Sequence, residues 1–301
     1  MMRSLLLSVV LLALGMSACS DDAATVSDDE RCEDLGTCVD SARATVCGES
    51  GLGFLFHSTG GSFLSLFQAE LGHRYVAVDP SCRFSVFQMV GSGIGTAFEG
   101  TLTPAQAREV DELLQLDQWE AADSQGGHCA VPDAGSLRLA WGEQSTFVSG
   151  ACGGQPDELW PTLGLTLEAL PDLLRSFGDP ADGPIRYALT ELDPRDTPDE
   201  ASDTAPRWPL AIPASVAAMR IEGDDLVGYA DVRVGVATDQ EAAALRALRA
   251  SVLDTARFPE AIPIRDDDGS HYRLELRDVV QFETADGLPL VPWNPSASDQ
   301  D

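Results

Sequence analysis

One stretch of the chain has almost nothing to contribute to a hydrophobic core, and apolar-rich sequence lies on both sides of it. Residues 193–207 include three prolines, five acidic residues and no large apolar side chain. This composition predicts an exposed linker. The chain has 301 residues, of which 44% are hydrophobic, enough for two ordinary domains. We therefore expect domains over residues 46–192 and 208–293, followed by a tail over residues 294–301.

The first domain begins with a predicted layer of antiparallel strands. Residues 73–79 and 82–90 are rich in β-branched and aromatic side chains, and residues 96–100 resume the pattern after the glycines of residues 91–95. Those glycines favour a hairpin turn or bulge. They do not fit a phosphate-binding loop, because the spacing is Gly-x-Gly-x-Gly and no helical pattern follows.

A helix is predicted to begin after Thr103. Thr103 and Gln106 form a Thr-x-x-Gln capping box, and Pro104 suits the first helical turn. Apolar residues at helical spacing form its buried stripe: Ala107, Val110, Leu113 and Leu114. One main amphipathic helix therefore follows the strands.

The first domain ends with a second predicted hairpin, a helix and a strand. The Gly142-Glu143 turn joins residues 137–141 to 144–148, and paired residue numbers then sum to 285. A helix interrupted by proline is expected over residues 165–177, before Gly178, and a strand over residues 184–189.

The second half of the chain repeats this plan. Strand-like residues 226–236 lead to Thr238 and Glu241, a second capping box, and a turn at Asp268-Gly269 leads to a strand over residues 272–276. When the sequence is aligned with itself at an offset of 135 residues, Thr103 aligns with Thr238. Over residues 96–150, 9 of the 55 aligned positions are identical. Two explanations remain open: a tandem duplication, or two unrelated α+β domains with a common local pattern. Either way the expected fold class is α+β, with two small domains.

The N-terminus has the organisation of an export signal. Arg3 supplies a positive charge, residues 5–14 are an apolar run broken only by a serine, and Met16-Ser17-Ala18-Cys19 follows. The run is too short to span a bilayer. This segment resembles the signal of the bacterial lipoprotein class, although Met16 stands where Leu, Val or Ile is usual. The alternative is an ordinary secretory signal, cleaved after Ser17.

The resemblance covers residues 1–19 and implies a lipid anchor. It implies cleavage after residue 18 and attachment of a diacylglyceryl group to the Cys19 thiol. In that class Ser20, rather than Asp, after the cysteine points to the outer membrane rather than the inner one. Residues 19–45 then form an acidic tether, since residues 20–40 carry eight acids and one arginine. The implied partner is therefore a membrane, reached through the lipid.

The remaining cysteines form an even set. If Cys19 carries the lipid, the disulfide candidates are Cys32, Cys38, Cys47, Cys82, Cys129 and Cys152. They fall into two clusters of three along the chain, so complete pairing requires at least one bridge between the clusters. The hairpin register places Asp133 opposite Cys152, which favours a Cys129–Cys152 pair. The spacing does not favour zinc, because the chain has no Cys-x-x-Cys.

The charge of the chain excludes several functions. The formal net charge is −30, from 49 acids against 19 bases, and every base is arginine. A chain this acidic is a poor ligand for nucleic acid. Without lysine it has no Walker A loop and no Schiff-base residue.

Other candidate sites have ordinary structural interpretations. Residues 57–61, His-Ser-Thr-Gly-Gly, are predicted as a glycine-rich loop at a strand start rather than a base beside a nucleophile. Asp266, Asp268, Gly269 and Glu275 match part of a calcium loop, but Ile264 occupies its first position. We expect a polar hairpin turn there, and core packing for the tryptophans. No catalytic residue, metal set or cofactor is assigned.

Three functions remain open from the sequence. The first is a non-catalytic envelope lipoprotein, a binding or structural module whose partner the sequence does not identify; a protein in the envelope is one candidate. The second is an envelope hydrolase without a local motif, which a Ser or Asp beside a His in a cleft would favour. The third is a binding protein for a cation or a basic peptide, suggested by the acidity.

Overall fold

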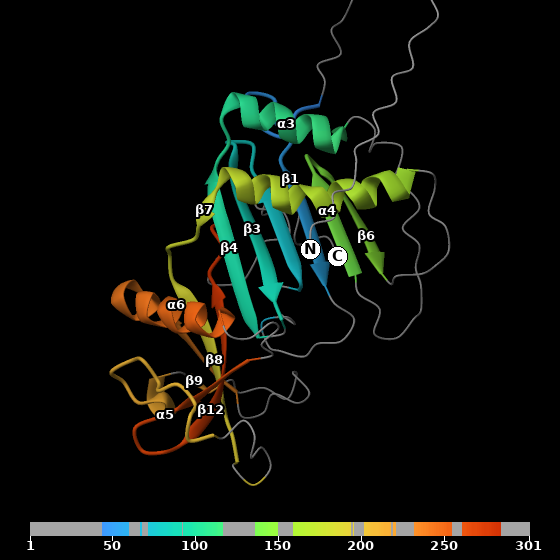
Figure 1. Ribbon diagram of the computed structural model, residues 1–301. Helices are drawn as coiled ribbons and strands as arrows, with labels where there is room; N and C mark the ends of the chain where they lie inside the picture. Colours follow the sequence, from blue (N-terminus) through green and yellow to red (C-terminus); the bar gives the residue numbers. More distant parts are fainter. Residues whose placement is uncertain are drawn as a thin grey trace, which may run out of the picture. The chain divides into compact units, whose positions relative to one another are not determined.

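The computed structural model describes the strands, the main helices and their nearby turns (Figure 1). The described residues are 44–59, 67, 72–91, 93–116, 136–149, 159–193, 195, 202–217, 219–220, 232–254 and 261–283. The signal segment, the tether up to residue 43, and five of the cysteines (Cys19, Cys32, Cys38, Cys129 and Cys152) lie outside them.

The strands build one mixed sheet of twelve strands. Its path is β6-β5-β1-β2-β3-β4-β12-β8-β10-β9, with β11 beside β12 and β7 beside β4. The strands are β1 (Phe54–Thr59), β2 (Arg74–Val78), β3 (Arg83–Val90), β4 (Ile94–Thr101), β5 (Ser136–Trp141), β6 (Gln144–Ser149), β7 (Asp179–Pro180), β8 (Ile185–Glu191), β9 (Met219–Arg220), β10 (Val232–Ala237), β11 (Ile262–Arg265) and β12 (His271–Asp278). The fold is therefore α+β, as expected.

The helices are α3 (Pro104–Leu114), α4 (Leu159–Phe177), α5 (Ala214–Ala217) and α6 (Asp239–Leu253). The capping box at the start of α3 is confirmed: the Gln106 amide N–H donates to Thr103 Oγ1, and the Thr103 amide donates to Gln106 Oε1. The prediction of a second capping box is wrong. Thr238 is the N-cap of α6, but its side chain makes no capping hydrogen bond. Asp239, the next residue, has a φ of 50°, which alters the entry to this helix.

Both predicted hairpins are confirmed. β3 and β4 pair around the turn that begins at Gly91, which has a φ of 74°. β5 and β6 pair from Ser136 with Ser149 to Trp141 with Gln144, so the paired numbers sum to 285. The helix expected to end before Gly178 does so, although α4 begins earlier than residue 165 and continues through Pro171.

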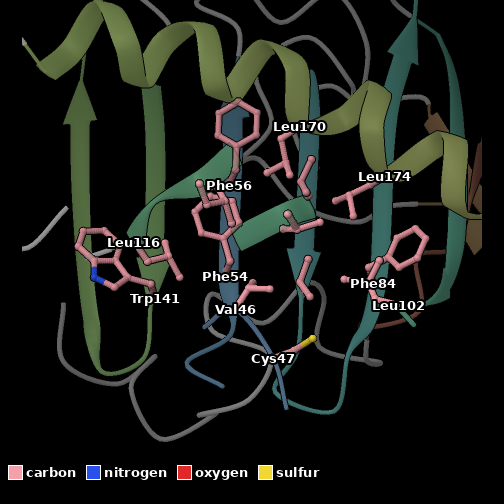
Figure 2. Close-up of a cluster of buried hydrophobic side chains, with 14 of the residues drawn as sticks. Val46, Cys47, Phe54, Phe56, Phe84, Leu102, Leu116, Trp141, Leu170 and Leu174 are labelled. Atoms are coloured by element: carbon pink, nitrogen blue, oxygen red, sulfur yellow. The ribbon is translucent and has the colours of Figure 1, made fainter. Parts of the chain in front are cut away.

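A large apolar core lies between the first part of the sheet and helices α3 and α4. Phe54, Phe56 and Trp141 project from the sheet, and Leu170 and Leu174 meet them from α4 (Figure 2). Burial at this level stabilises the folded state by about 1.5–3 kcal/mol for each large apolar side chain. Trp141 is thus a core residue, as expected, and is 3% exposed.

A disulfide lies at the edge of this core. Cys47 and Cys82 are bonded, with their Cα atoms 5.0 Å apart and a sequence separation of 35 residues. The bridge joins one cysteine from each sequence cluster, which is the kind of link that the parity argument requires. It ties the segment before β1 to the turn between β2 and β3.

Two further cores complete the molecule. Leu55, Tyr75 and Phe87 lie on the other face of the sheet, with Phe67 and Phe282 beside them. A third core packs α6 against β8, β11 and β12. Its buried members include Leu189, Leu245, Ile264, Leu274 and Leu276.

Strands on both sides of residues 193–207 pair with one another. β8 precedes that segment, yet it pairs with β10 on one edge and β12 on the other. β4 also joins β12, in parallel, through two residue pairs: Leu276 with Ile94 and Arg277 with Gly95. The local elements keep the offset of 135 residues, since Thr103 and Thr238 both precede helices, but the strand order differs in the two halves.

Candidate functional site

A polar row crosses three neighbouring strands next to the largest core. Ser58 on β1 lies opposite Arg74 on β2, and Arg74 lies opposite Gln88 on β3. Directly opposed residues point to the same face of a sheet. The next row on the same face of the sheet, two residues away on each strand, is apolar: Phe56, Val76 and Val86. The core therefore ends at this row and polar side chains replace it.

This row lines a cleft of about 330 Å³. Its lining residues are Phe56, Ser58, His73, Arg74, Gln88 and Met89. The four polar residues are partly exposed, whereas Phe56 and Met89 are 5% and 7% exposed. The volume lies at the lower end of the range for small-molecule sites. Solvent thus reaches the polar groups. The Phe56 side chain belongs to the core that ends at this row, whereas the Met89 side chain packs on the other face of the sheet with Leu55 and Phe87.

The polar lining is rich in hydrogen-bond donors. Arg74 carries a permanent positive charge and five N–H groups, and Ser58 and Gln88 each supply at least one donor. Burial, and next the charge of Arg74, lower the pKa of His73, so its imidazole is neutral at pH 7 and keeps one N–H. None of the lining residues that the structure describes is acidic. Within the described residues Arg74 forms no ion pair.

The histidine beside Ser58 is not the one that the sequence suggested. His57 and Ser58 lie inside β1, not in a loop at a strand start, and adjacent residues of a strand point to opposite faces. The His57 ring packs edge-on against Tyr75, with 6.1 Å between ring centroids. The histidine that shares a cleft with Ser58 is His73, whose amide donates to the Ser58 carbonyl at 2.8 Å.

A buried group of charges lies elsewhere, where β4 meets β12. The Asp278 side chain is almost wholly buried and accepts hydrogen bonds from the Ala97 amide and from Arg249 Nη1, both at 3.0 Å. Arg249, on α6, also donates to the Gly95 carbonyl at 2.9 Å. We call this group, Asp278 and Arg249 with the β4 backbone, the joint. It connects β4, β12 and α6.

A second ion pair adjoins the joint on the other face of β12. Arg277 is 1% exposed and donates to both Glu283 oxygens, at 2.6 and 2.7 Å, while its guanidinium carbon lies 5.1 Å from the centre of the Phe67 ring. Burial raises the pKa of Glu283, but hydrogen bonds and charge from Arg277, with Arg186 next, lower it overall. Its carboxylate therefore stays ionised. Paired charges like these hold structure and leave no open face for a ligand.

The calcium-like segment is a hairpin turn. Residues 266–270 connect β11 to β12, the Gly269 amide donates to the Asp266 carbonyl, and Asp266 also accepts from the Ala214 amide at 2.8 Å. The part of the chain that the structure describes holds no group of three His, Cys, Asp or Glu residues placed to bind a metal. His128 and Trp119 lie outside it, whereas Trp208 is buried beside Tyr187.

None of the described helices is long and apolar enough to cross a membrane. Comparison of the chain with protein-family models, with curated proteins and with solved structures gave no match.

Proposed function

We propose that the protein is a non-catalytic lipoprotein of the cell envelope that acts as a binding module. The cleft on β1, β2 and β3 carries this proposal, because it offers several hydrogen-bond donors beside a buried apolar wall. Such a combination orients a small ligand. The anchor is supported by the lipobox-like residues that end at Cys19 and by the acidic segment behind them. A protein partner in the envelope and residence at the outer membrane remain part of this proposal.

The anchor is tested by the mass of the mature chain. We expect protein extracted from bacterial membranes to begin at Cys19 and to carry acyl groups. A Cys19→Ser variant should fail to incorporate labelled palmitate, whereas Cys32→Ser, as the matched control, should incorporate it. A mature chain that begins at Ala18, without acyl groups and recovered in the soluble fraction, would refute the anchor.

A hydrolase is the second candidate, and one observation favours it: Ser58 and His73 line the same cleft. A serine nucleophile also needs a third group to orient its base, usually a carboxylate. Among the described residues that line the cleft, none supplies one. The test is a panel of ester, amide, phosphate and glycan substrates, compared between the wild type and Ser58→Ala. Turnover that Ser58→Ala abolishes would establish the hydrolase and overturn the non-catalytic proposal.

A binding site for a cation or a basic peptide receives less support. Carboxylates would have to face such a ligand, yet the cleft presents Arg74 instead. The acidity of the chain then serves solubility. The tandem duplication stays a proposal as well, supported by the common offset of β4 with α3 and of β10 with α6.

A further inference from the structure

The described lining of the cleft has a charge opposite to that of the chain as a whole. The chain carries a net charge of −30, whereas Arg74 is the one formally charged residue among those that the structure describes around the cleft. At physiological ionic strength, charges are screened beyond about 8 Å. A ligand inside the cleft is therefore governed mainly by Arg74 and the nearby dipoles, not by the distant acids.

The donors are arranged so that one group can meet several of them. Ser58, Arg74 and Gln88 lie side by side on consecutive strands, which are spaced about 4.8 Å apart. The guanidinium fork matches the two oxygens of a carboxylate or a phosphate. Ser58 and Gln88 flank it and can donate to the same oxygens. Phe56, on the same face, supplies apolar surface for the rest of the molecule.

We infer that this cleft binds a small organic anion, with its carboxylate or phosphate on Arg74 and a short apolar part against Phe56. The inference rests on the proposed binding function and names the class of ligand. The occupant is small because the cleft holds only about 330 Å³.

Isothermal titration calorimetry on the mature full-length chain tests this inference. The probes are butanoate, its neutral isostere butanamide, the cation butylamine, and inorganic phosphate. We expect butanoate or phosphate to bind at concentrations up to about 10 mM, and the amide and the amine to bind at least about tenfold more weakly. Tighter binding of butanoate would identify carboxylates as the class, and tighter binding of phosphate would identify phosphate esters.

Variants locate the site. Arg74→Gln should weaken anion binding at least about tenfold, because a hydrogen bond to a charged group is lost. Arg74→Lys should lose less, since it keeps the charge without the fork. Arg108→Gln is the matched control, because Arg108 is exposed on α3 and the net charge changes equally. Melting curves for each variant separate a binding defect from unfolding.

Three results would overturn the inference: no binding of either anion, equal binding of butanamide or butylamine, or unchanged binding in Arg74→Gln. These failures are distinct from failure of the proposed function. The anchor is judged by the mass of the mature chain and catalysis by turnover, and neither measurement depends on Arg74.

Discussion

Two regions of one sheet are stabilised in different ways. The β1–β6 region packs against α3 and α4 through a continuous apolar core, with the Cys47–Cys82 disulfide at its edge. The β8–β12 region has its own apolar core under α6, but it meets β4 through two residue pairs and a set of buried charges. Apolar burial is non-directional, whereas buried ion pairs require particular partners. The charges therefore define how β12 aligns with β4.

The same contrast distinguishes the polar groups of the cleft, which can bind a ligand, from the charged groups of the joint, which hold the structure. The donors of the cleft face solvent at the margin of the first region, so a ligand can reach them. In the joint, Asp278 Oδ2 accepts from Arg249 and from the Ala97 amide, and Arg249 also donates to a backbone carbonyl, while Asp278 Oδ1 lies 3.6 Å from Arg246 Nε. We therefore expect substitutions at the joint to change stability and substitutions in the cleft to change binding.

The largest expected effect comes from removing Asp278. Asp278→Ala leaves Arg249 without its buried counter-ion, and breaking a buried pair costs about 3–5 kcal/mol. Urea unfolding should show this loss of unfolding free energy. The control is Asp172→Ala, which removes an exposed pair with Arg175 and should cost less than about 1 kcal/mol. Equal losses in the two variants would mean that the joint does not hold the regions together.

Removing the disulfide should have the next largest effect. Replacing both Cys47 and Cys82 by serine releases a constraint across 35 residues of sequence, and such bridges are worth about 2–4 kcal/mol. Unfolding followed by Trp fluorescence should report the loss. Reductant should destabilise the double variant less than the wild type. An unchanged midpoint in the double variant would argue against this bridge.

A smaller loss is expected from Gly95→Ala. A methyl group at Gly95 would lie 2.4 Å from the Phe87 ring and 3.0 Å from Arg277 Cβ, so the ring or the neighbouring strand must shift. Overpacking of this kind costs about 1–3 kcal/mol. Thermal unfolding measures it, with Gly183→Ala as the control, because nothing lies within 4 Å of a methyl group there. A neutral Gly95→Ala would show that β4 and β12 are farther apart than described.

The smallest expected effects come from replacing the N-cap residues of α3 and α6. Thr103→Ala removes a side-chain hydrogen bond to the Gln106 amide and should cost about 1 kcal/mol. Thr238→Ala removes no such bond and should cost at most a few tenths of that. Chemical denaturation of both variants gives the difference directly. A larger loss at Thr238 would mean that its side chain caps α6 after all.

Local patterns predicted most of the helices and strands, because capping residues, turn residues and apolar spacing act over a few positions. The register of the β5–β6 hairpin followed from its two-residue turn. The strand β1 was missed, since Gly51 and Gly53 precede it and His57-Ser58-Thr59 ends it with polar residues. The pairing of β4 with β12 was missed because its partners are about 180 residues apart and share only two residue pairs.

The cleft was beyond prediction for the same reason. Ser58, Arg74 and Gln88 are separated by 14 to 16 positions, and only the pairing of three strands brings them into one row. Ser58 was noticed next to His57, but the alternation of β1 separates those two side chains. The buried charges of β12 gave no signal either, because Arg277 and Asp278 look like an ordinary exposed pair in the sequence. The polar composition of residues 73, 74 and 88 carried no motif.

Hydrogen–deuterium exchange of the mature chain, with and without saturating butanoate or phosphate, tests the central contrast most directly. The account predicts slower exchange in peptides that cover residues 54–59 and 72–90, and no change over residues 261–283. In Asp278→Ala without ligand, exchange should rise over residues 261–283, while residues 54–59 change least. Ligand-induced protection over residues 261–283, with none at residues 72–90, would contradict the assignment of binding to the cleft and of structure to the joint.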